Sequence, residues 1–320
     1  MPNSPEHSER PAPAGKVVVT GAGGFLGRHV VRRLAEQGAR VVALCGAEHE
    51  LDRVRSLAAQ AEAGDILETT LLNRHVAGAD AVIHLAGPPA VRESFTNPVD
   101  FSRVHVLGTV AVAEACRRHH VRRLVYVSSA EVYGSLGLEP VSEHTPLRPR
   151  SPYGAAKASA ETFVQTMVAS SDTTAAILRP FSVFGPGGAP GAVVPTILRQ
   201  ALAETRIELA RLTPVRDYCY IGDIARAVVL AAECDIAATT IVNLGSGTGT
   251  SVRQLAEVAL EVVGRRLPIV QSASGDRPQS ADVDQLVADV AMAESVLGWR
   301  PQVTLYEGLA HTVEHLKGSQ

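Results

Sequence analysis

The sequence predicts an α/β protein built around a doubly wound parallel sheet. Two observations support this fold class: short apolar strand patterns alternate with helical patterns, and a glycine-rich turn directly follows the first strand. Strands separated by helices pair in parallel, because each helix returns the chain to the same edge of the sheet. With 320 residues, 46% of them hydrophobic, the chain is long enough to bury such a core.

The elements follow one another as β-α-β units. Residues 16–20 form a β-branched run that predicts the first strand, 25–37 have the 3.6-residue period of a helix, and 40–44 predict the second strand. The same patterns predict further strands at 81–85, 124–128, 175–178 and 240–244, and helices at about 98–119 and 194–204.

A change in composition after residue 178 predicts a second region. Prolines and glycines interrupt regular structure there, at Pro180, Gly185, Pro186, Gly187, Gly188, Pro190, Gly191 and Pro195. We expect a disordered tail at 1–14, a main domain at 15–180 plus about 217–247, and a smaller C-terminal region at 181–216 and 248–320. The smaller region is expected to cover the carboxyl ends of the strands, where such sheets bind ligands and substrates.

Composition argues against several classes of partner. The net charge of -3 is spread along the chain, so neither nucleic acid nor a membrane surface is an expected partner. No segment has the roughly 20 apolar residues of a bilayer span or the pattern of a signal peptide, which predicts a cytoplasmic protein. Without a C-x-x-C pair, the cysteines predict reduced thiols and no metal site. These cysteines are Cys45, Cys116, Cys219 and Cys234.

The glycine-rich turn predicts a dinucleotide site in the main domain. The segment TGAGGFLG at 20–27 has the spacing G-x-x-G-x-x-G. Glycine permits a tight turn and a close backbone approach, and the following helix presents free N–H groups to a pyrophosphate. The predicted contacts are Gly21, Gly24, Phe25, Leu26 and Gly27.

The second strand lacks the acidic residue that binds the ribose 2′-hydroxyl in this type of site. It ends in Leu44 and Cys45, so Glu48 is a candidate substitute, whereas Arg53 would tolerate a 2′-phosphate. The choice between NAD and NADP stays open, with a slight preference for NADP. Asp65 and Ile66 are expected near the adenine.

A serine, a tyrosine and a lysine form the candidate catalytic group. Ser129 follows a predicted strand, and Tyr153 and Lys157 lie four residues apart, on one face of a helix. Tyrosine has a pKa of about 10, so it exchanges protons near neutrality only when a cation stabilises the phenolate. Lys157 supplies that cation, and Ser129 can hydrogen-bond the reacting oxygen while hydride moves.

With these motifs, the chain resembles the extended short-chain dehydrogenase/reductases, and among them the NAD(P)-dependent sugar-nucleotide epimerase/dehydratase family. The resemblance covers about 16–316 and implies a Rossmann-type sheet. It also includes HLAG at 84–87, SSAEVYG at 128–134, SPYGAAK at 151–157, LRP at 178–180, RDY at 216–218 and LGW at 297–299.

The resemblance implies roles for several residues. Ser129, Tyr153 and Lys157 would carry catalysis, and Lys157 would also bind the nicotinamide ribose. The remaining implied contacts are Leu85 and Ala86 for the cofactor, Glu131 as a candidate catalytic and substrate residue, and Ser182, Arg216 and Arg277 for the substrate.

The resemblance implies a nucleotide-sugar substrate and leaves the reaction open. Departures from the family pattern at the second strand, at His105 and at Ser182 favour a 4-ketoreductase of a nucleotide-linked 4-keto-6-deoxyhexose. The alternatives are a 4-epimerase, then a UDP-glucuronate decarboxylase, and, outside catalysis, an NAD(P)-sensing binding module. Relatives commonly dimerise through two helices, here the one near 99–119 and the one carrying Tyr153, so a homodimer is expected.

Overall fold

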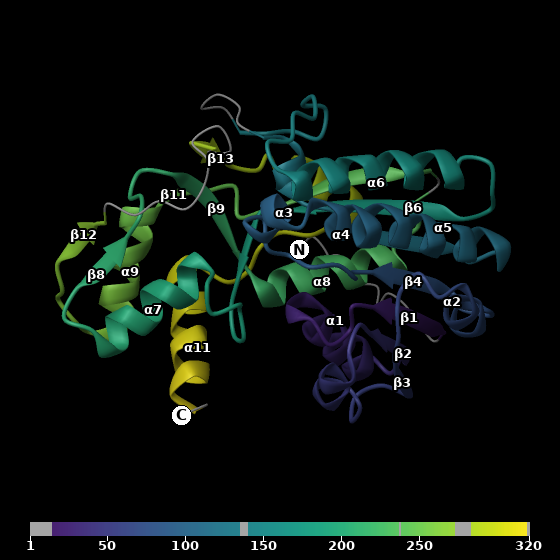
Figure 1. The fold of residues 1–320 in the computed structure, drawn as a ribbon, viewed down its shortest axis with the longest axis horizontal. Helices are drawn as coiled ribbons and strands as arrows, with labels where there is room; N and C mark the ends of the chain where they lie inside the picture. Colours follow the sequence, from purple (N-terminus) through teal and green to yellow (C-terminus); the bar gives the residue numbers. More distant parts are fainter. Residues whose placement is uncertain (1–14, 135–139, 237, 273–282, 319–320) are drawn as a thin grey trace, which may run out of the picture.

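A seven-stranded parallel sheet forms the centre of the molecule. The computed structural model describes residues 15–134, 140–236, 238–272 and 283–318, so the tail predicted at 1–14 lies outside the described residues. The strand order is β10-β6-β5-β4-β1-β2-β3, and every neighbouring pair is parallel (Figure 1). The predicted fold class is confirmed. The strands are β1 Lys16–Thr20, β2 Arg40–Cys45, β3 Gln60–Ala63, β4 Ala81–His84, β5 Arg123–Val127, β6 Thr174–Pro180 and β10 Thr240–Leu244.

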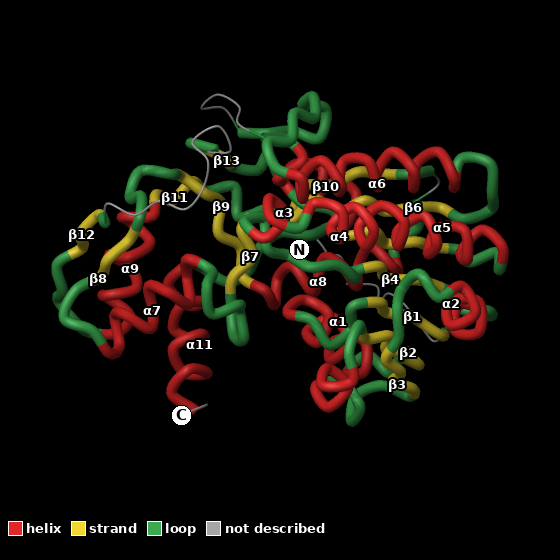
Figure 2. The backbone as a smooth tube through the Cα atoms, viewed as in Figure 1, coloured by secondary structure: helices red, strands yellow, loops and turns green. Residues whose placement is uncertain are grey.

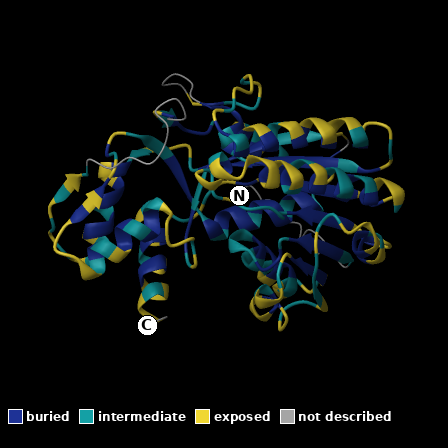
Figure 3. Ribbon diagram, viewed as in Figure 1, coloured by how far each residue is buried: buried dark blue, intermediate teal, exposed yellow. Residues whose placement is uncertain are grey.

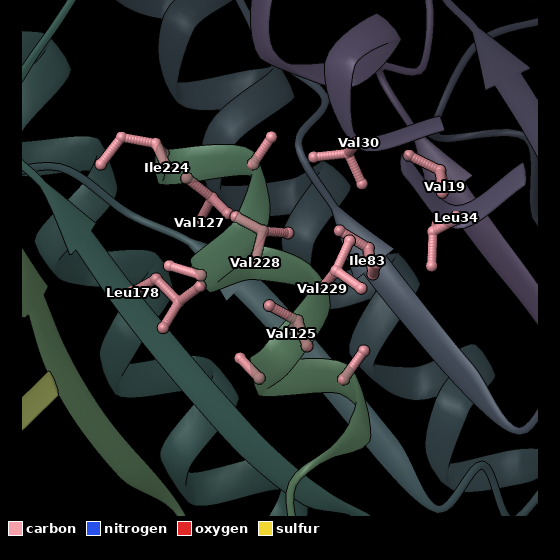
Figure 4. Packing of buried hydrophobic residues seen from close by; sticks show 14 of the residues in the cluster. Val19, Val30, Leu34, Ile83, Val125, Val127, Leu178, Ile224, Val228 and Val229 are labelled. Atoms are coloured by element: carbon pink, nitrogen blue, oxygen red, sulfur yellow. The ribbon is translucent and has the colours of Figure 1, made fainter. Parts of the chain in front are cut away.

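Helices cover both faces of this sheet. Val17 and Val19 of β1 pack into the core beneath α1 and α8, whereas Val18 packs into the core beneath α2, α5 and α6. This alternation follows from the two-residue period of a strand. Figure 4 shows the first core, with Val228 and Val229 of α8 among residues of α1 and the strands. The helices are α1 Phe25–Glu36, α2 Thr69–Val76, α5 Thr109–Arg118, α6 Pro152–Val168, α8 Ile221–Glu233 and α10 Ala291–Leu297.

The strand order reverses direction at β1. β1 lies between β2 and β4. From β1 the chain first forms β2 and β3 on one side, and it then crosses over to form β4, β5, β6 and β10 on the other side. Ligands of such sheets bind at this point of reversal. The glycine-rich turn at 21–24 therefore lies where a dinucleotide is expected, at the start of α1.

The helix predicted at 98–119 contains a wider turn. It consists of α4 Pro98–Ser102, a π-helical segment η2 Arg103–Gly108, and α5. The apolar pattern of the sequence does not reveal such a turn, because a single π-helical turn adds only one residue to the helical repeat. π-helical turns are frequent at functional sites, and this one carries His105.

Three large apolar side chains are exposed on the helices of the predicted dimer contact. Val99 is 77% exposed, Leu107 56% and Phe163 45%. Nothing in the structure tests the oligomeric state, so the homodimer stays a prediction. Within the described parts of the chain, no helix has the length and apolar character needed to cross a bilayer.

The remaining elements form a smaller assembly beside the carboxyl edge of the sheet (Figure 2). Strand β9 pairs with β7, β11 and β13, and β8 pairs with β12. Helices α7, α9 and α11 enclose a separate buried apolar core. Figure 3 colours buried and exposed residues along these elements. The strands are β7 Ser182–Phe184, β8 Ile207–Leu209, β9 Val215–Tyr220, β11 Gly249–Ser251, β12 Ile269–Gln271 and β13 Gln285–Leu286. The helices are α7 Val193–Ala203, α9 Val252–Val263 and α11 Leu305–Gly318, and the short elements are α3 Glu93–Thr96, η1 Glu48–Arg53 and η3 Ala130–Val132.

Candidate active site

The glycine turn leaves no room for a side chain at Gly21 or Gly27. A Cβ on Gly21, whose φ is 66°, would lie 2.8 Å from the Cα of Ala86, and a Cβ on Gly27 would lie 2.1 Å from the Gly21 carbonyl oxygen. Among the described residues no side chain caps α1 at Gly24, so its first N–H groups, including those of Phe25 and Leu26, remain for a phosphate. The turn therefore fits the pyrophosphate of a dinucleotide.

The ends of the neighbouring strands lie beside the glycine turn. Leu85 N–H donates to the Thr20 carbonyl oxygen at 3.1 Å, and this bond brings Leu85 and Ala86 beside the glycine turn. Asp65 follows β3, and Arg103 of η2 donates to its carboxylate at 2.7 Å. A backbone N–H from Leu67 and then Arg103 lower the pKa of Asp65. The side chain of Ile66 packs against Gly108, where a Cβ would approach it to 2.8 Å.

Ser129, Tyr153 and Lys157 meet at the carboxyl end of β5. Ser129 follows this strand and caps η3, its hydroxyl accepting from Glu131 N–H at 3.2 Å. Ser151 caps α6 by accepting from Gly154 N–H at 3.0 Å, and Pro152 begins the helix. This start places Tyr153 in the first turn and Lys157 one turn later, where its Nζ donates to the Val127 carbonyl oxygen at 2.8 Å.

Burial changes the proton affinity of both helix residues. It raises the pKa of Tyr153 to about 12, a rise that a hydrogen bond with Ser129 opposes and the charge of Glu131 increases. Burial lowers the pKa of Lys157 to about 7, against the opposing charge of Glu161. The Lys157 ammonium lies 6.0 Å from the centre of the Tyr153 ring. Loss of a proton from Tyr153 therefore depends on nearby positive charge.

The lowered pKa of Lys157 predicts a specific dependence of stability on pH. Between about 7 and 10.5, the unfolded chain keeps the Lys157 proton and the folded protein has lost it. The unfolded state then binds more protons, so the free energy of unfolding rises with pH across this window. We expect cofactor-free protein to gain about 2 kcal/mol more from pH 7 to pH 9 than the Lys157→Met variant. Urea unfolding at pH 7 and pH 9 measures the free energy of unfolding of each protein. An equal change between the two pH values for both proteins would contradict the prediction.

A buried histidine and two threonines support the site, and the sequence assigned none of them a role, although Thr20 and His84 stand in the TGAGGFLG and HLAG motifs. The Nδ1 of His84 lies 2.7 Å from Thr20 Oγ1, and its Nε2 lies 3.0 Å from Thr109 Oγ1. Thr109 in turn donates to the His105 carbonyl oxygen at 2.6 Å. These bonds connect the end of β1, the end of β4 and the π-helical turn. A threonine ending a strand carries no sequence signal of this role, since the partners of the Thr20 hydroxyl, His84 and Ala86, are 64 and 66 residues away.

His105 lies directly against Tyr153. Its ring meets the Tyr153 ring edge-on, with centroids 5.3 Å apart, and its Nε2 lies 3.0 Å from the Pro88 carbonyl oxygen. A Cβ on Gly87 would lie 2.2 Å from the ring, so only glycine fits there. Burial, followed by the charge of Lys157, lowers the pKa of His105 to about 3. The ring is therefore neutral near pH 7, and it packs against Tyr153 without adding charge.

A buried ion pair behind Lys157 was also missed. Arg179, at the end of β6, donates to both carboxylate oxygens of Glu161 at 3.0 and 2.6 Å. It also donates to Tyr133 Oη at 2.7 Å, and Tyr133 donates to Asn243 Oδ1 of β10 at 2.7 Å. Glu161 lies one helical turn after Lys157. The only sequence signal was Arg179 within the LRP motif, because residues 18 positions apart give no local pattern.

The predicted substrate residues lie in two places. Glu131 is in η3 beside Tyr153, close enough for its charge to raise the pKa of the phenol. Ser182 lies on β7 opposite Tyr218 of β9, the strand that also carries Arg216. Arg216 Nη1 donates to the Val215 carbonyl oxygen at 2.9 Å. Ser182 and Arg216 lie in the smaller assembly, and Arg277 lies outside the described residues.

The fold and site together define a class of enzyme. A glycine turn that fits a pyrophosphate follows β1, at the point where the strand order reverses. At the end of β5, two strands from β1, a buried tyrosine and lysine lie beside a serine. These are the parts of a dinucleotide-dependent oxidoreductase in which a side chain moves the proton. The chain is an enzyme of this class.

Comparison with known proteins identifies the family. The model of the NAD dependent epimerase/dehydratase family matches residues 17–245, and the chain belongs to this family. A putative UDP-glucose 4-epimerase of Methanocaldococcus jannaschii is 31% identical over 309 residues, covering 95% of this chain and 99% of the relative. The UDP-glucose 4-epimerase of Azospirillum brasilense is 31% identical, covering 95% and 92%. The predicted membership of the extended short-chain dehydrogenase/reductases is confirmed.

Solved structures agree over nearly the whole chain. MoeE5 in complex with UDP-glucuronic acid and NAD has a TM-score of 0.87 at 32% identity, covering 96% of this chain and 100% of MoeE5. The Thermus thermophilus UDP-glucose 4-epimerase in complex with NAD has a TM-score of 0.85 at 30% identity, covering 95% and 100%. The similarity therefore extends to the smaller assembly as well as the sheet.

Proposed function

We propose that this protein is an NAD-dependent 4-epimerase of UDP-linked hexoses, which interconverts UDP-glucose and its C4 epimer, UDP-galactose. The observation that supports this most directly is the full-length similarity to UDP-glucose 4-epimerases, at 31% identity over 95% of this chain. The relatives favour this alternative over the 4-ketoreductase expected from the sequence. A complete Ser129, Tyr153 and Lys157 group argues for catalysis and against a sensing module.

The residues of the site account for proton movement at C4. Tyr153 Oη takes the proton of the 4-hydroxyl as that carbon is oxidised to a ketone, and it returns a proton to the same oxygen when the carbon is reduced from the opposite face. Ser129 binds this oxygen, and the Lys157 ammonium stabilises the phenolate. NAD, when bound, supplies the hydride acceptor and a positive charge beside the phenol. The proton and hydride balance over one cycle, so no external reductant is consumed.

NAD fits this cycle better than NADP. Two of the similar structures, MoeE5 and the Thermus thermophilus enzyme, hold NAD. The preference for NADP rested on the missing carboxylate at the end of β2, and the proposed cycle needs only one tightly held cofactor. In our proposal the glycine turn, Leu85, Ala86, Asp65 and Ile66 bind NAD, together with Tyr153 and Lys157.

The smaller assembly is proposed to bind the sugar nucleotide. Ser182 and Arg216 lie on the paired strands β7 and β9, next to the carboxyl edge of the main sheet. A guanidinium is suited to diphosphate oxygens, which favours Arg216 as a substrate contact. This assignment follows the predicted division at 181–216 and 248–320.

Charge favours a neutral hexose over a uronic acid. The carboxylate of Glu131 lies beside Tyr153, and no ion pair neutralises it among the residues that the structure describes. A substrate carboxylate placed near it would be repelled. UDP-glucose is therefore preferred over the UDP-glucuronic acid seen with MoeE5.

The test combines cofactor identification with turnover in the absence of added cofactor. The dinucleotide released from purified protein is identified by mass spectrometry, and UDP-glucose alone is then followed by NMR. We expect bound NAD and an equilibrium mixture of the two C4 epimers. An empty protein that requires NADPH and reduces a 4-keto sugar would overturn the epimerase proposal in favour of a ketoreductase. Loss of CO₂ from UDP-glucuronic acid would instead identify a decarboxylase, and faster epimerisation of that substrate would contradict the role given to Glu131.

A further inference from the structure

The adenosine ribose site has no carboxylate in its usual place. Parallel sheets of this type bind the ribose 2′-hydroxyl with an acidic residue at the end of the second strand. Here β2 ends at Cys45, whose thiol is buried and whose pKa is raised mainly by burial. A neutral thiol is a weak hydrogen-bond acceptor. Another residue has to accept from the ribose if NAD is bound tightly.

Glu50 lies against the glycine turn at this edge. Its Oε2 accepts from Gly46 N–H, directly after β2, at 3.1 Å. A Cβ on Gly23 would lie 2.5 Å from the Cβ of Glu50 and 2.8 Å from its carbonyl oxygen. Gly23 is not part of the G-x-x-G-x-x-G spacing, so the close packing of Glu50 explains this additional glycine. Glu48, the candidate from the sequence, is exposed at the start of the same η1 turn.

One oxygen of the Glu50 carboxylate remains for a ligand. The described residues provide one bond to this carboxylate, from Gly46 to Oε2, and no cation pairs with it. The two nearby guanidinium groups are bound to backbone carbonyl oxygens. Arg53 donates to Gly23 at 3.0 Å, and Arg28 donates to Pro186 at 2.6 Å. These arginines therefore hold the loops together, and Glu50 is the side chain that presents an acceptor.

We propose that Glu50 binds the 2′-hydroxyl of the adenosine ribose, replaces the carboxylate missing from β2 and selects NAD over NADP. The free oxygen accepts a hydrogen bond from the hydroxyl. The 2′-phosphate of NADP offers no such donor and brings negative charge next to a carboxylate. The side chain that selects NAD over NADP therefore lies in the η1 turn, which follows β2. This inference rests on the proposed use of a nicotinamide dinucleotide, and it concerns only which form is bound.

A competition experiment measures this selectivity without relying on activity. The purified protein is incubated with equal excess concentrations of NAD and NADP until exchange is complete, then desalted, and the bound dinucleotides are released and quantified by mass spectrometry. We expect wild-type protein to retain NAD over NADP by at least about tenfold. A hydrogen bond to a charged group corresponds to roughly 10-fold to 100-fold in affinity, so Glu50→Gln should lower this ratio by about tenfold or more.

Asp52→Asn is the matched control, because it removes an exposed carboxylate from the same η1 turn. Its NAD to NADP ratio is expected to equal that of the wild type. Glutamine keeps an oxygen for Gly46 N–H, and equal melting temperatures would show that the turn is intact. Equal ratios for wild type and Glu50→Gln, or a wild type that retains both forms equally, would overturn the role of Glu50. Retention of neither dinucleotide would instead contradict the proposed function itself.

Discussion

Replacing Tyr153 by phenylalanine is expected to lower kcat for epimerisation by about a thousandfold, with little change in bound NAD. The variant keeps the ring that packs against His105 and Phe101, and it loses the phenol that exchanges the proton. Positioned acid–base groups contribute roughly 100-fold to 10,000-fold to rates. Ser129 cannot replace the phenol, because a serine hydroxyl is a much weaker acid than a tyrosine phenol.

The control for Tyr153→Phe is a second buried tyrosine that also lies close to Lys157. Tyr126 is buried on β5, and the Lys157 ammonium lies 5.1 Å from the centre of its ring. Tyr126→Phe removes a phenol and keeps this contact, so its kcat is expected to stay within about tenfold of the wild type. Initial rates with UDP-glucose and the NAD content of each protein are measured together. If Tyr153→Phe keeps more than a tenth of the wild-type rate, another group moves the proton.

The main sheet could be predicted because each of its strands is encoded by a short continuous segment of the sequence. The strands expected at 16–20 and 240–244 match β1 and β10, since buried parallel strands are short apolar runs between helices. β3, at Gln60–Ala63, was missed because only half of it is apolar and it lies at the sheet edge. The strands of the smaller assembly have two to six residues and pair with distant segments, so their sequences alone give little signal.

The same distinction applies to the site. The predictions for Gly21, Tyr153 and Lys157 could be made from the sequence because they depend on backbone conformation and helix spacing within a few residues. The choice of Glu50 over Glu48 depends on which side of the η1 turn faces Gly23, and a two-residue difference in a short turn is not encoded by periodicity. The π-helical turn at Arg103–Gly108 was hidden for a similar reason.

Breaking the ion pair between Glu161 and Arg179 is expected to have the largest effect on stability. Both side chains are almost fully buried, at 1% and 3% exposure. Arg179→Met leaves the Glu161 carboxylate buried without its partner and removes the donor to Tyr133 Oη, so the free energy of unfolding should fall by about 3–5 kcal/mol. Urea unfolding of purified proteins measures this change.

The double variant separates the cost of an unpaired charge from that of lost packing. Changing Glu161 and Arg179 together to methionine removes both charges, so we expect it to be more stable than Arg179→Met alone. An exposed pair provides the control: Arg117 contacts Glu114 on the surface of α5, and Arg117→Met should leave the free energy of unfolding nearly unchanged. If Arg179→Met costs no more than this control, the buried pair does not hold α6 against β6. Because Lys157 lies one turn from Glu161, a large effect would show that the sheet anchors the catalytic helix through this pair.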